Sequence, residues 1–220
     1  MTFRKRLFDL VLATSLLAVL WPVLVGVALA IAMRDGRPIL YLSARMKSPT
    51  QSFILLKFRT MQSEATDDTV SAGYKSARIT QTGRFLRRSR LDELPQLFNI
   101  LWGDMSFVGP RPPLPRYVSL RPEIYQKVLQ SRPGVTGLAS LIYHRHEEEI
   151  LARCDSPDET HETYLRRCVP AKARLDLIWA RHWTFCFDLV LILQTLAHFF
   201  SRLPHARRGA REREWSKNRQ

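Results

Sequence analysis

The stretch GRFLRRSRLDELPQLFNILWGDMSFVGPRP, residues 83–112, carries a density of charge that sets it apart from the rest of the chain. Five arginines lie within it, around the adjacent carboxylates Asp92 and Glu93. Guanidinium groups bind phosphate through paired hydrogen bonds, and carboxylates attract hard cations such as Mg²⁺. The pattern therefore predicts a site that holds phosphate and a divalent cation together.

A short helix is predicted over residues 94–102, directly after the acidic pair. Pro95 fits only in the first turn of a helix, so Asp92 and Glu93 are expected at or just before its N-terminus. The free N–H groups and the dipole there favour anions, both these carboxylates and a ligand phosphate. Ser89 and Asp92 also match a capping box, and by itself the acidic pair fits capping better than chemistry. The arginines and the turn that closes the stretch favour the phosphate site.

Arg111 lies between two prolines, which restrict the backbone on both sides of it. A guanidinium held in this way can be aimed at a phosphate in advance, with less ordering entropy lost on binding. A plain rigid turn is the alternative interpretation. Upstream, Arg84, Arg88 and Asp92 are spaced four apart and share one face if a helix continues through them. Surface salt bridging is the alternative explanation of that spacing.

Two short strands are predicted before this stretch, over residues 38–42 and 52–59, with a polar turn between them. Alternation along the second strand directs Lys57 and Arg59 to the same face. A solvated edge is the plain interpretation of this pair. Residues 62–73 are polar and acidic, and we expect a loop there rather than a metal site.

An uncharged apolar run over residues 10–33 has basic residues on both sides. As a straight helix it would be about 36 Å long, enough to cross a bilayer. A cleaved signal peptide has a shorter apolar region of about 7–15 residues, and a single span leaves one basic flank on the wrong side. Pro22 near the middle favours a third interpretation, a re-entrant hairpin whose arms each cross about one leaflet. The sequence leaves the hairpin and the full span nearly balanced.

Residues 183–203 form a second apolar segment, which Asp188 interrupts. Asp188 would cost about 2.5–3.5 kcal/mol at the middle of a bilayer, so we prefer an amphipathic helix at the membrane interface. A polytopic protein with two spanning helices is the alternative. A helix that opens at Pro170 precedes this segment. The basic tail from Arg202 onward is expected to be disordered and drawn to anionic lipid.

The formal net charge of +14 implies an anionic partner: a lipid surface, a phosphorylated substrate or nucleic acid. A tethered nucleic-acid-binding module is compatible with this charge and with the Trp and Phe content. Such a module leaves Asp92 and Glu93 unexplained, because carboxylates repel a polyanion. The three cysteines show no metal-binding spacing, which indicates a reducing compartment.

Five short motifs occur in one order and spacing along the chain. They are Lys57–Met61, Arg78–Arg87, Leu91–Leu97, Ser106–Pro112 and Arg132–Gly137. On these motifs the chain resembles a bacterial sugar transferase of the monotopic phosphoglycosyl transferase family, over most of residues 1–200. One such motif is weak evidence, whereas five in register are strong evidence.

The resemblance implies an enzyme that moves a sugar-1-phosphate from a UDP-sugar to undecaprenyl phosphate and releases UMP. It makes Asp92 the nucleophile on the β-phosphate of the donor and the protein ligand of Mg²⁺. Glu93 would orient the pair or accept a proton. Phosphate or substrate binding would fall to Lys57, Arg59, Arg87, Arg111 and Arg145. The sugar and the polysaccharide pathway are left open.

The expected fold is a small α+β domain, mainly helical, with amphipathic helices at the membrane interface. Residues 1–36 would form the re-entrant anchor, 37–201 the cytosolic catalytic domain and 202–220 the basic tail. The resemblance implies a place at the cytoplasmic face of the bacterial inner (plasma) membrane, in contact with lipid and without nucleic acid. A homodimer is left open.

Two segments depart from the family pattern. Trp21-Pro22 stands where the family has Ser-Pro, at the expected break of the membrane helix. Residues 138–144 replace the family's Trp-Ala-Gln-Val-Asn-Gly-Arg, so His144 aligns with the family's arginine and Arg145 follows one place later. We expect nucleotide-sugar selectivity in this region, so the departure leaves the sugar undefined.

Overall fold

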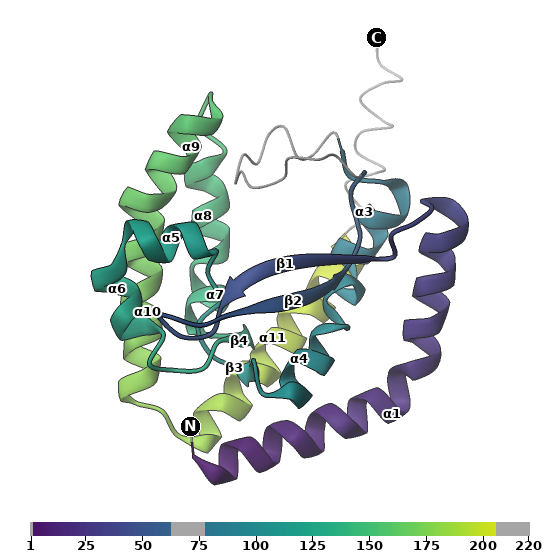
Figure 1. The fold of residues 1–220 in the computed structure, drawn as a ribbon, viewed down its shortest axis with the longest axis horizontal. Coiled ribbons are helices and arrows are strands. Elements are labelled where there is room, and N and C mark those ends of the chain that lie inside the picture. Colours follow the sequence, from purple (N-terminus) through teal and green to yellow (C-terminus); the bar gives the residue numbers. More distant parts are fainter. Residues whose placement is uncertain (1, 63–77, 206–220) are drawn as a thin grey trace.

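The computed structural model describes residues 2–62 and 78–205, and Figure 1 shows their arrangement. Helices dominate, and the strands form two small two-stranded sheets, so the predicted mainly helical α+β class is confirmed. In chain order the elements are α1 (Phe3–Arg34), β1 (Leu40–Met46), β2 (Ser52–Phe58), α3 (Gln81–Arg88), η1 (Leu91–Glu93), α4 (Gln96–Trp102), β3 (Ser106–Val108), α5 (Pro115–Leu120), α6 (Pro122–Val128), β4 (Gly134–Thr136), α7 (Leu138–Ile142), α8 (His144–Leu151), α9 (Pro157–Thr163), η2 (Tyr164–Cys168), α10 (Val169–Arg181) and α11 (Phe185–His205).

The two sheets join segments that the sequence motifs mark. β1 and β2 form an antiparallel hairpin in which Tyr41 is opposite Lys57. Both predicted strands are confirmed, although β1 begins two residues later than predicted and continues to Met46. β3 and β4 pair in parallel, which brings the motif that contains Arg111 beside the motif at 132–137. The predicted loop at 62–73 lies, from residue 63 onward, outside the described residues.

A buried asparagine joins helix α4 to the open edge of β2. Asn99 accepts a hydrogen bond from the Leu56 N–H at 2.9 Å and donates one to the Ile54 carbonyl at 2.8 Å. Its amide therefore completes backbone pairing that the two-stranded sheet leaves open on this side. Because β2 carries Lys57 and the turn before α4 carries Asp92, this contact fixes the two halves of the site relative to each other.

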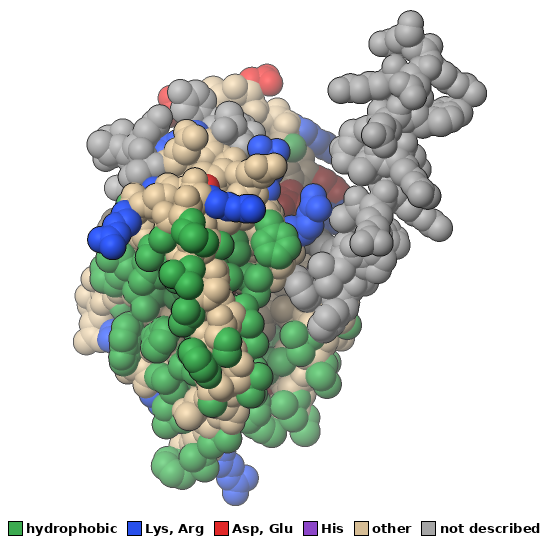
Figure 2. All heavy atoms as spheres, turned by 90° about the vertical axis from the view of Figure 1, so that its right-hand side faces the viewer, with side chains coloured by type: hydrophobic (Ala, Val, Ile, Leu, Met, Phe, Trp, Pro, Cys, Tyr) green, Lys and Arg blue, Asp and Glu red, His purple; other side chains and the backbone are tan. Residues whose placement is uncertain are grey.

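Helix α1 contains Pro22, and Figure 1 shows it bent, with one limb along the base of the domain and the other rising beside it. Its outer surface is apolar, with Val19, Trp21 and Leu29 exposed to 72%, 61% and 55%. Figure 2 shows apolar side chains covering this face, with Lys and Arg above and below them. Within the described residues, α1 is the one helix long and apolar enough to cross a membrane. An apolar face of this kind marks contact with lipid or with another protein.

The first limb of α1 is held to the domain by a buried ion pair. Lys5 pairs with Asp188 of α11 and donates to the Val108 carbonyl at 3.0 Å. Trp179 and Trp183 each donate an indole N–H to Asp188 at 2.9 Å. Asp188 is therefore buried among protein partners, which explains how a carboxylate is accommodated in the apolar segment that the sequence shows there.

The second limb of α1 is held at its end by Arg59. The guanidinium donates to the Gly36 carbonyl at 2.7 Å and the Arg37 carbonyl at 3.3 Å, and also to the Asp35 carbonyl. The Asp35 carboxylate in turn accepts a hydrogen bond from the Thr80 hydroxyl at 3.0 Å. Both ends of α1 are thus attached to the same domain.

Helix α11 packs against β3, β4 and α7 rather than standing apart from the domain. Its apolar part, Phe185–His198, is shorter than a membrane span. The alternative with two spanning helices therefore gains no support from the part of the chain that the structure describes.

Replacing Lys5 with methionine is expected to destabilise the protein by about 3–5 kcal/mol, because it leaves the buried Asp188 carboxylate without its cation. Arg4→Met is the matched control, since Arg4 is exposed one position earlier on the same helix. Thermal unfolding of the detergent-solubilised protein measures the difference. Equal unfolding temperatures for Lys5→Met and Arg4→Met would show that the pair does not hold α1.

Candidate active site

The acidic pair lies in η1, a single 3₁₀ turn between α3 and α4. Helix α3 ends at Arg88, and Arg90 adopts a left-handed backbone conformation with φ 54°. For a residue with a side chain this conformation costs about 1–2 kcal/mol, and such strain concentrates at functional sites. Arg84, Arg88 and Asp92 would share one face only in a continuous helix, and the helix is interrupted before Asp92.

The capping interpretation of the acidic pair is wrong. The Ser89 hydroxyl donates back to the Phe85 carbonyl at 2.9 Å, and η1 has no side-chain cap. Asp92 and Glu93 do lie just before α4, although α4 starts at Gln96, two residues later than predicted, with Pro95 as its N-cap. The position of the pair is thus confirmed, while its carboxylates are left for other contacts.

Asp92 is a buried carboxylate with one cation beside it. It is 1% exposed, and the Lys57 ammonium lies 2.6 Å from its Oδ2. The other oxygen, Oδ1, is buried and has no hydrogen-bond partner among the described residues. A carboxylate has about four lone-pair sites, so Asp92 can keep its contact with Lys57 and still offer Oδ1 to a ligand.

Glu93 links the acidic pair to three cations. Its Oε1 lies 3.1 Å from Arg90, 3.6 Å from Arg111 and 3.9 Å from Lys57. Burial would raise the pKa of Glu93, but the charges of Arg111, Arg90 and Lys57 outweigh it and hold the pKa below its ordinary value. Glu93 is therefore ionised at neutral pH and holds the cations close to Asp92.

Two interlocked turns support Arg111. The Gly134 N–H donates to the Pro110 carbonyl and the Gly109 N–H to the Thr136 carbonyl, both at 2.9 Å. The two backbones approach so closely that a Cβ on Gly134 would lie 2.2 Å from the Gly109 nitrogen. A side chain at either glycine would separate the turns, so the two motifs act as one rigid support.

The other predicted phosphate ligands lie in different surroundings. Arg87 donates through Nε to the Thr60 hydroxyl at 2.9 Å, just past the end of β2. Arg59 is buried, and its guanidinium bonds to backbone carbonyls at the end of α1. The Arg145 side chain is 85% exposed and pairs with Glu149 at 3.3 Å. Of the predicted cations, the structure brings Lys57 and Arg111 directly to the acidic pair.

His144 is a residue that the sequence prediction did not assign to the site. Burial lowers the pKa of its imidazole, Glu148 opposes this effect, and the charges of Arg90 and Arg111 add to it. His144 therefore lies within electrostatic reach of the arginines that hold Glu93. The alignment of His144 with the family's arginine was the signal that could have found it, whereas Arg145 lies toward solvent.

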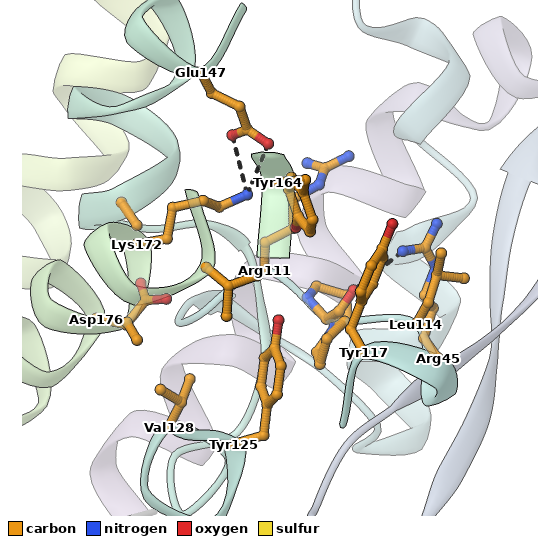
Figure 3. Close-up of a pocket in the computed structure, with 15 residues that line it drawn as sticks. Arg45, Arg111, Leu114, Tyr117, Tyr125, Val128, Glu147, Tyr164, Lys172 and Asp176 are labelled. Atoms are coloured by element: carbon orange, nitrogen blue, oxygen red, sulfur yellow. Dashed lines mark hydrogen bonds and ion pairs between the residues drawn. The ribbon is translucent and has the colours of Figure 1, made fainter. Parts of the chain in front are cut away.

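A cavity of about 250 Å³ has Arg111 in its wall (Figure 3). Arg111 also contacts Glu93, so it links the cavity to the acidic pair. Three tyrosines, Tyr117, Tyr125 and Tyr164, form part of its wall. Arg45 lies on the same side as Tyr117, and it donates to the Pro112 carbonyl at 3.3 Å. Burial, together with the nearby charge of Arg111, lowers the pKa of Arg45 to about 10. The cavity therefore opens beside two cations that repel each other, an arrangement that favours an anion.

Asp92 is the residue that best fits a divalent cation. No cluster of three His, Cys, Asp or Glu side chains occurs in residues 2–62 and 78–205, so these residues do not form an all-protein cage. Mg²⁺ commonly uses one or two carboxylates and takes its other ligands from water and substrate phosphates. The buried, unpartnered Oδ1 of Asp92 supplies such a carboxylate oxygen, so the residues present fit Mg²⁺ held jointly with a phosphorylated ligand.

The fold and the site define a protein with a long, exposed apolar helix and a buried carboxylate set among cations that suit phosphate. A sequence model of the bacterial sugar transferase family matches residues 1–202. The chain therefore belongs to the bacterial sugar transferase family.

The names of several curated relatives of this chain state an activity for those proteins. A UDP-glucose:undecaprenyl-phosphate glucose-1-phosphate transferase from Caulobacter vibrioides is 36% identical over 197 residues, covering 88% of this chain and 68% of that protein. A sugar transferase, EpsL, from Bacillus subtilis is 39% identical, covering 87% and 85%. A relative from Klebsiella pneumoniae, with the same name as the Caulobacter protein, is 31% identical, but this chain spans only 39% of its length.

Replacing Arg90 with glutamine is expected to raise the pKa of Glu93, because one of the three charges that oppose its burial is lost. A carboxylate with a raised pKa becomes protonated at a higher pH. As the pH is lowered, Arg90→Gln should therefore lose activity at a higher pH than the wild type does. Arg88→Gln, on the exposed surface of α3, is the control. The pH dependence of kcat/KM for the activity proposed below checks this, and an acid limb at the same pH in Arg90→Gln as in wild type would contradict it.

Proposed function

We propose that the protein transfers a sugar-1-phosphate from a UDP-sugar to undecaprenyl phosphate, with release of UMP, at the start of membrane-bound polysaccharide synthesis. The observation that carries the proposal is the buried Asp92, paired with Lys57 through one oxygen and unpartnered among the described residues at the other. The names of the Caulobacter and Klebsiella relatives support this pair of substrates.

Asp92 acts as the nucleophile in the proposed reaction. A carboxylate oxygen forms a bond to the β-phosphorus of the donor, while the bond from that phosphorus to the bridging oxygen breaks and UMP departs with the electron pair. An oxygen of the lipid phosphate then attacks the same phosphorus, and the bond to Asp92 breaks to restore the carboxylate. A covalent intermediate of this kind replaces one difficult displacement with two easier ones.

The cations around Asp92 make this attack electrostatically feasible. Lys57 and Arg111 reduce the repulsion between a carboxylate and a diphosphate, and Glu93 keeps both cations in place. Arg87, at the end of β2, is suited to a further phosphate oxygen. Asp92 would hold Mg²⁺, which when bound would neutralise charge on the diphosphate.

We infer that α1 is a re-entrant hairpin at the cytoplasmic face of the inner membrane. Its bend at Pro22 is apolar and exposed, while both of its ends bond to the domain that carries the site. A helix whose two ends contact one domain would have to release one of them in order to span the bilayer. The hairpin holds the site at the membrane surface, where a lipid-linked acceptor presents its phosphate.

Replacing Asp92 with asparagine is expected to lower transfer by at least about a thousandfold, because an amide cannot form the covalent phosphosugar adduct. Glu93→Gln should leave a trace of activity. UMP release in the presence of undecaprenyl phosphate measures turnover, and mass spectrometry of protein incubated with donor alone detects the adduct. Asp158→Asn, on α9, is the control. Turnover of Asp92→Asn near the wild-type rate would exclude Asp92 as the nucleophile.

The hairpin is expected to place both ends of α1 on the cytoplasmic side. Phe3 and Met33 are exposed to 81% and 79%, so single cysteines there are accessible to a membrane-impermeant maleimide. In a variant without the native cysteines, both positions should react in inside-out vesicles and neither in intact spheroplasts. Val19→Cys, near the bend, should react in neither preparation. Labelling of Phe3→Cys and Met33→Cys from opposite faces would instead show a full span.

A further inference from the structure

The cavity beside Arg111 has a polar inner end that the transfer chemistry at Asp92 does not use. The Tyr125 hydroxyl points into the cavity from below, and Asp176 lies to one side (Figure 3). Lys172, which pairs with Glu147 at 3.0 Å, closes the upper side. Burial raises the pKa of Asp176 to about 7, against the opposing effects of the Lys172 charge and the Ala139 N–H. Desolvated polar groups that face a cavity in this way suit hydrogen bonding to a ligand.

We propose that this cavity holds the nucleoside of the donor, so that Asp176 and Tyr125 read the edge of a uracil base while the sugar lies outside. The inference rests on the proposed function for the identity of the donor. It goes further by assigning the two ends of the donor to different parts of the protein.

The direction of the reaction supports this assignment. In a displacement at phosphorus the entering and leaving oxygens lie on opposite sides. If Asp92 enters, UMP must leave on the side away from Asp92. Arg111 contacts Glu93 at one end of this path and lines the cavity at the other. A leaving group that stays bound to Arg111 therefore reaches the cavity, whereas the sugar stays with the phosphorus near Asp92.

The size of the cavity and the charges beside it also support the assignment of the nucleoside to the cavity. The cavity, at about 250 Å³, is smaller than the roughly 300–1,000 Å³ of sites for drug-sized ligands, so it suits one part of a UDP-sugar rather than the whole. Arg45 and Arg111 lie at the side where the α-phosphate would pass. Among the described residues, no carboxylate pairs with Arg45, which donates to the Ser43 hydroxyl and the Pro112 carbonyl. Two guanidinium groups can therefore share a phosphate at this point.

The inner end of the cavity offers both the hydrogen-bond donors and the hydrogen-bond acceptors that uracil requires. Uracil presents an N–H donor between two carbonyl acceptors, and a carboxylate with a phenol hydroxyl can satisfy both kinds of group. Tyr164, whose ring lies 4.9 Å from that of Tyr117, provides an aromatic wall for the flat base. Cytosine reverses one donor and one acceptor, and a site built on hydrogen bonds rejects such an analogue strongly.

The test measures binding of UMP and CMP to the full-length protein in nanodiscs by calorimetry, without lipid acceptor. Tyr125→Phe keeps the ring and removes the hydroxyl, and Asp176→Asn keeps the shape of the side chain. Each should weaken UMP binding by about tenfold, the loss of one buried hydrogen bond, and narrow the preference for UMP over CMP. Glu149→Gln, exposed on α8 close to Glu147, should change neither quantity. Thermal unfolding checks that each variant is folded. If Asp176→Asn is not folded, the UMP affinity of Tyr125→Phe alone tests the inference.

A second arm compares transfer from UDP-glucose and UDP-galactose. The ratio of kcat/KM for these donors should stay within about twofold of wild type in Tyr125→Phe, because the sugar lies outside the cavity. Unchanged UMP binding in both variants, or a shifted sugar preference with unchanged UMP binding, would overturn the inference. Wild-type protein that binds UMP but never transfers sugar phosphate would remove the proposed function and leave the cavity assignment standing. Sugar-phosphate transfer by variants that bind UMP with wild-type affinity would instead remove the cavity assignment and leave the proposed function standing.

Discussion

The structure depends on holding one carboxylate beside a cation in a place from which water is almost excluded. Asp92 is 1% exposed, and an unpaired charge at that depth would be costly. Lys57 provides the compensation, but it comes from β2, while Asp92 comes from a turn 35 residues later in the chain. Asn99 ties that turn's helix to β2 by bonding to the strand's own backbone, so the ion pair depends on a neutral amide for its geometry. The left-handed Arg90 completes the arrangement by interrupting the helix where the carboxylates must turn inward.

Helix α1 and the site are connected through hydrogen bonds at both ends of the helix. Arg59 lies one residue beyond β2, the strand that carries Lys57, and it holds the far end of α1 by its backbone. At the near end, Lys5 bonds to the Val108 carbonyl, and Val108 is the last residue of β3, directly before the turn that presents Arg111. Each end of α1 is therefore bonded within a few residues of a cation of the site. The same contacts therefore fix the position of α1 relative to these cations.

Local chemistry was readable from the sequence wherever one residue constrains its own backbone. Pro95 placed the start of α4 to within two residues, the polar turn between two strand-like segments predicted the hairpin, and the prolines around Arg111 identified a rigid turn. The sequence could not predict contacts that depend on residues far away in the chain. Arg59 has the same charge as Lys57 and lies two positions away, yet it bonds to carbonyls at the end of α1. Arg145 and His144 are adjacent, and only the orientation of α8 decides which of them faces the arginines.

The basic residues fall into two groups, those bonded within the fold and those at the site. Arg59 and Lys5 are used within the fold, since each is buried and bonded to backbone or carboxylate oxygens. Lys57 and Arg111 are only partly committed, because the carboxylates they contact retain oxygens for other groups, and Arg111 also borders a cavity. A cation that fully neutralised Asp92 would block it, and a cation too far away would leave it repelling a diphosphate. A shared set of cations, held by Glu93 between Asp92 and the cavity, avoids both failures and gives a role to two adjacent carboxylates in a chain of net charge +14.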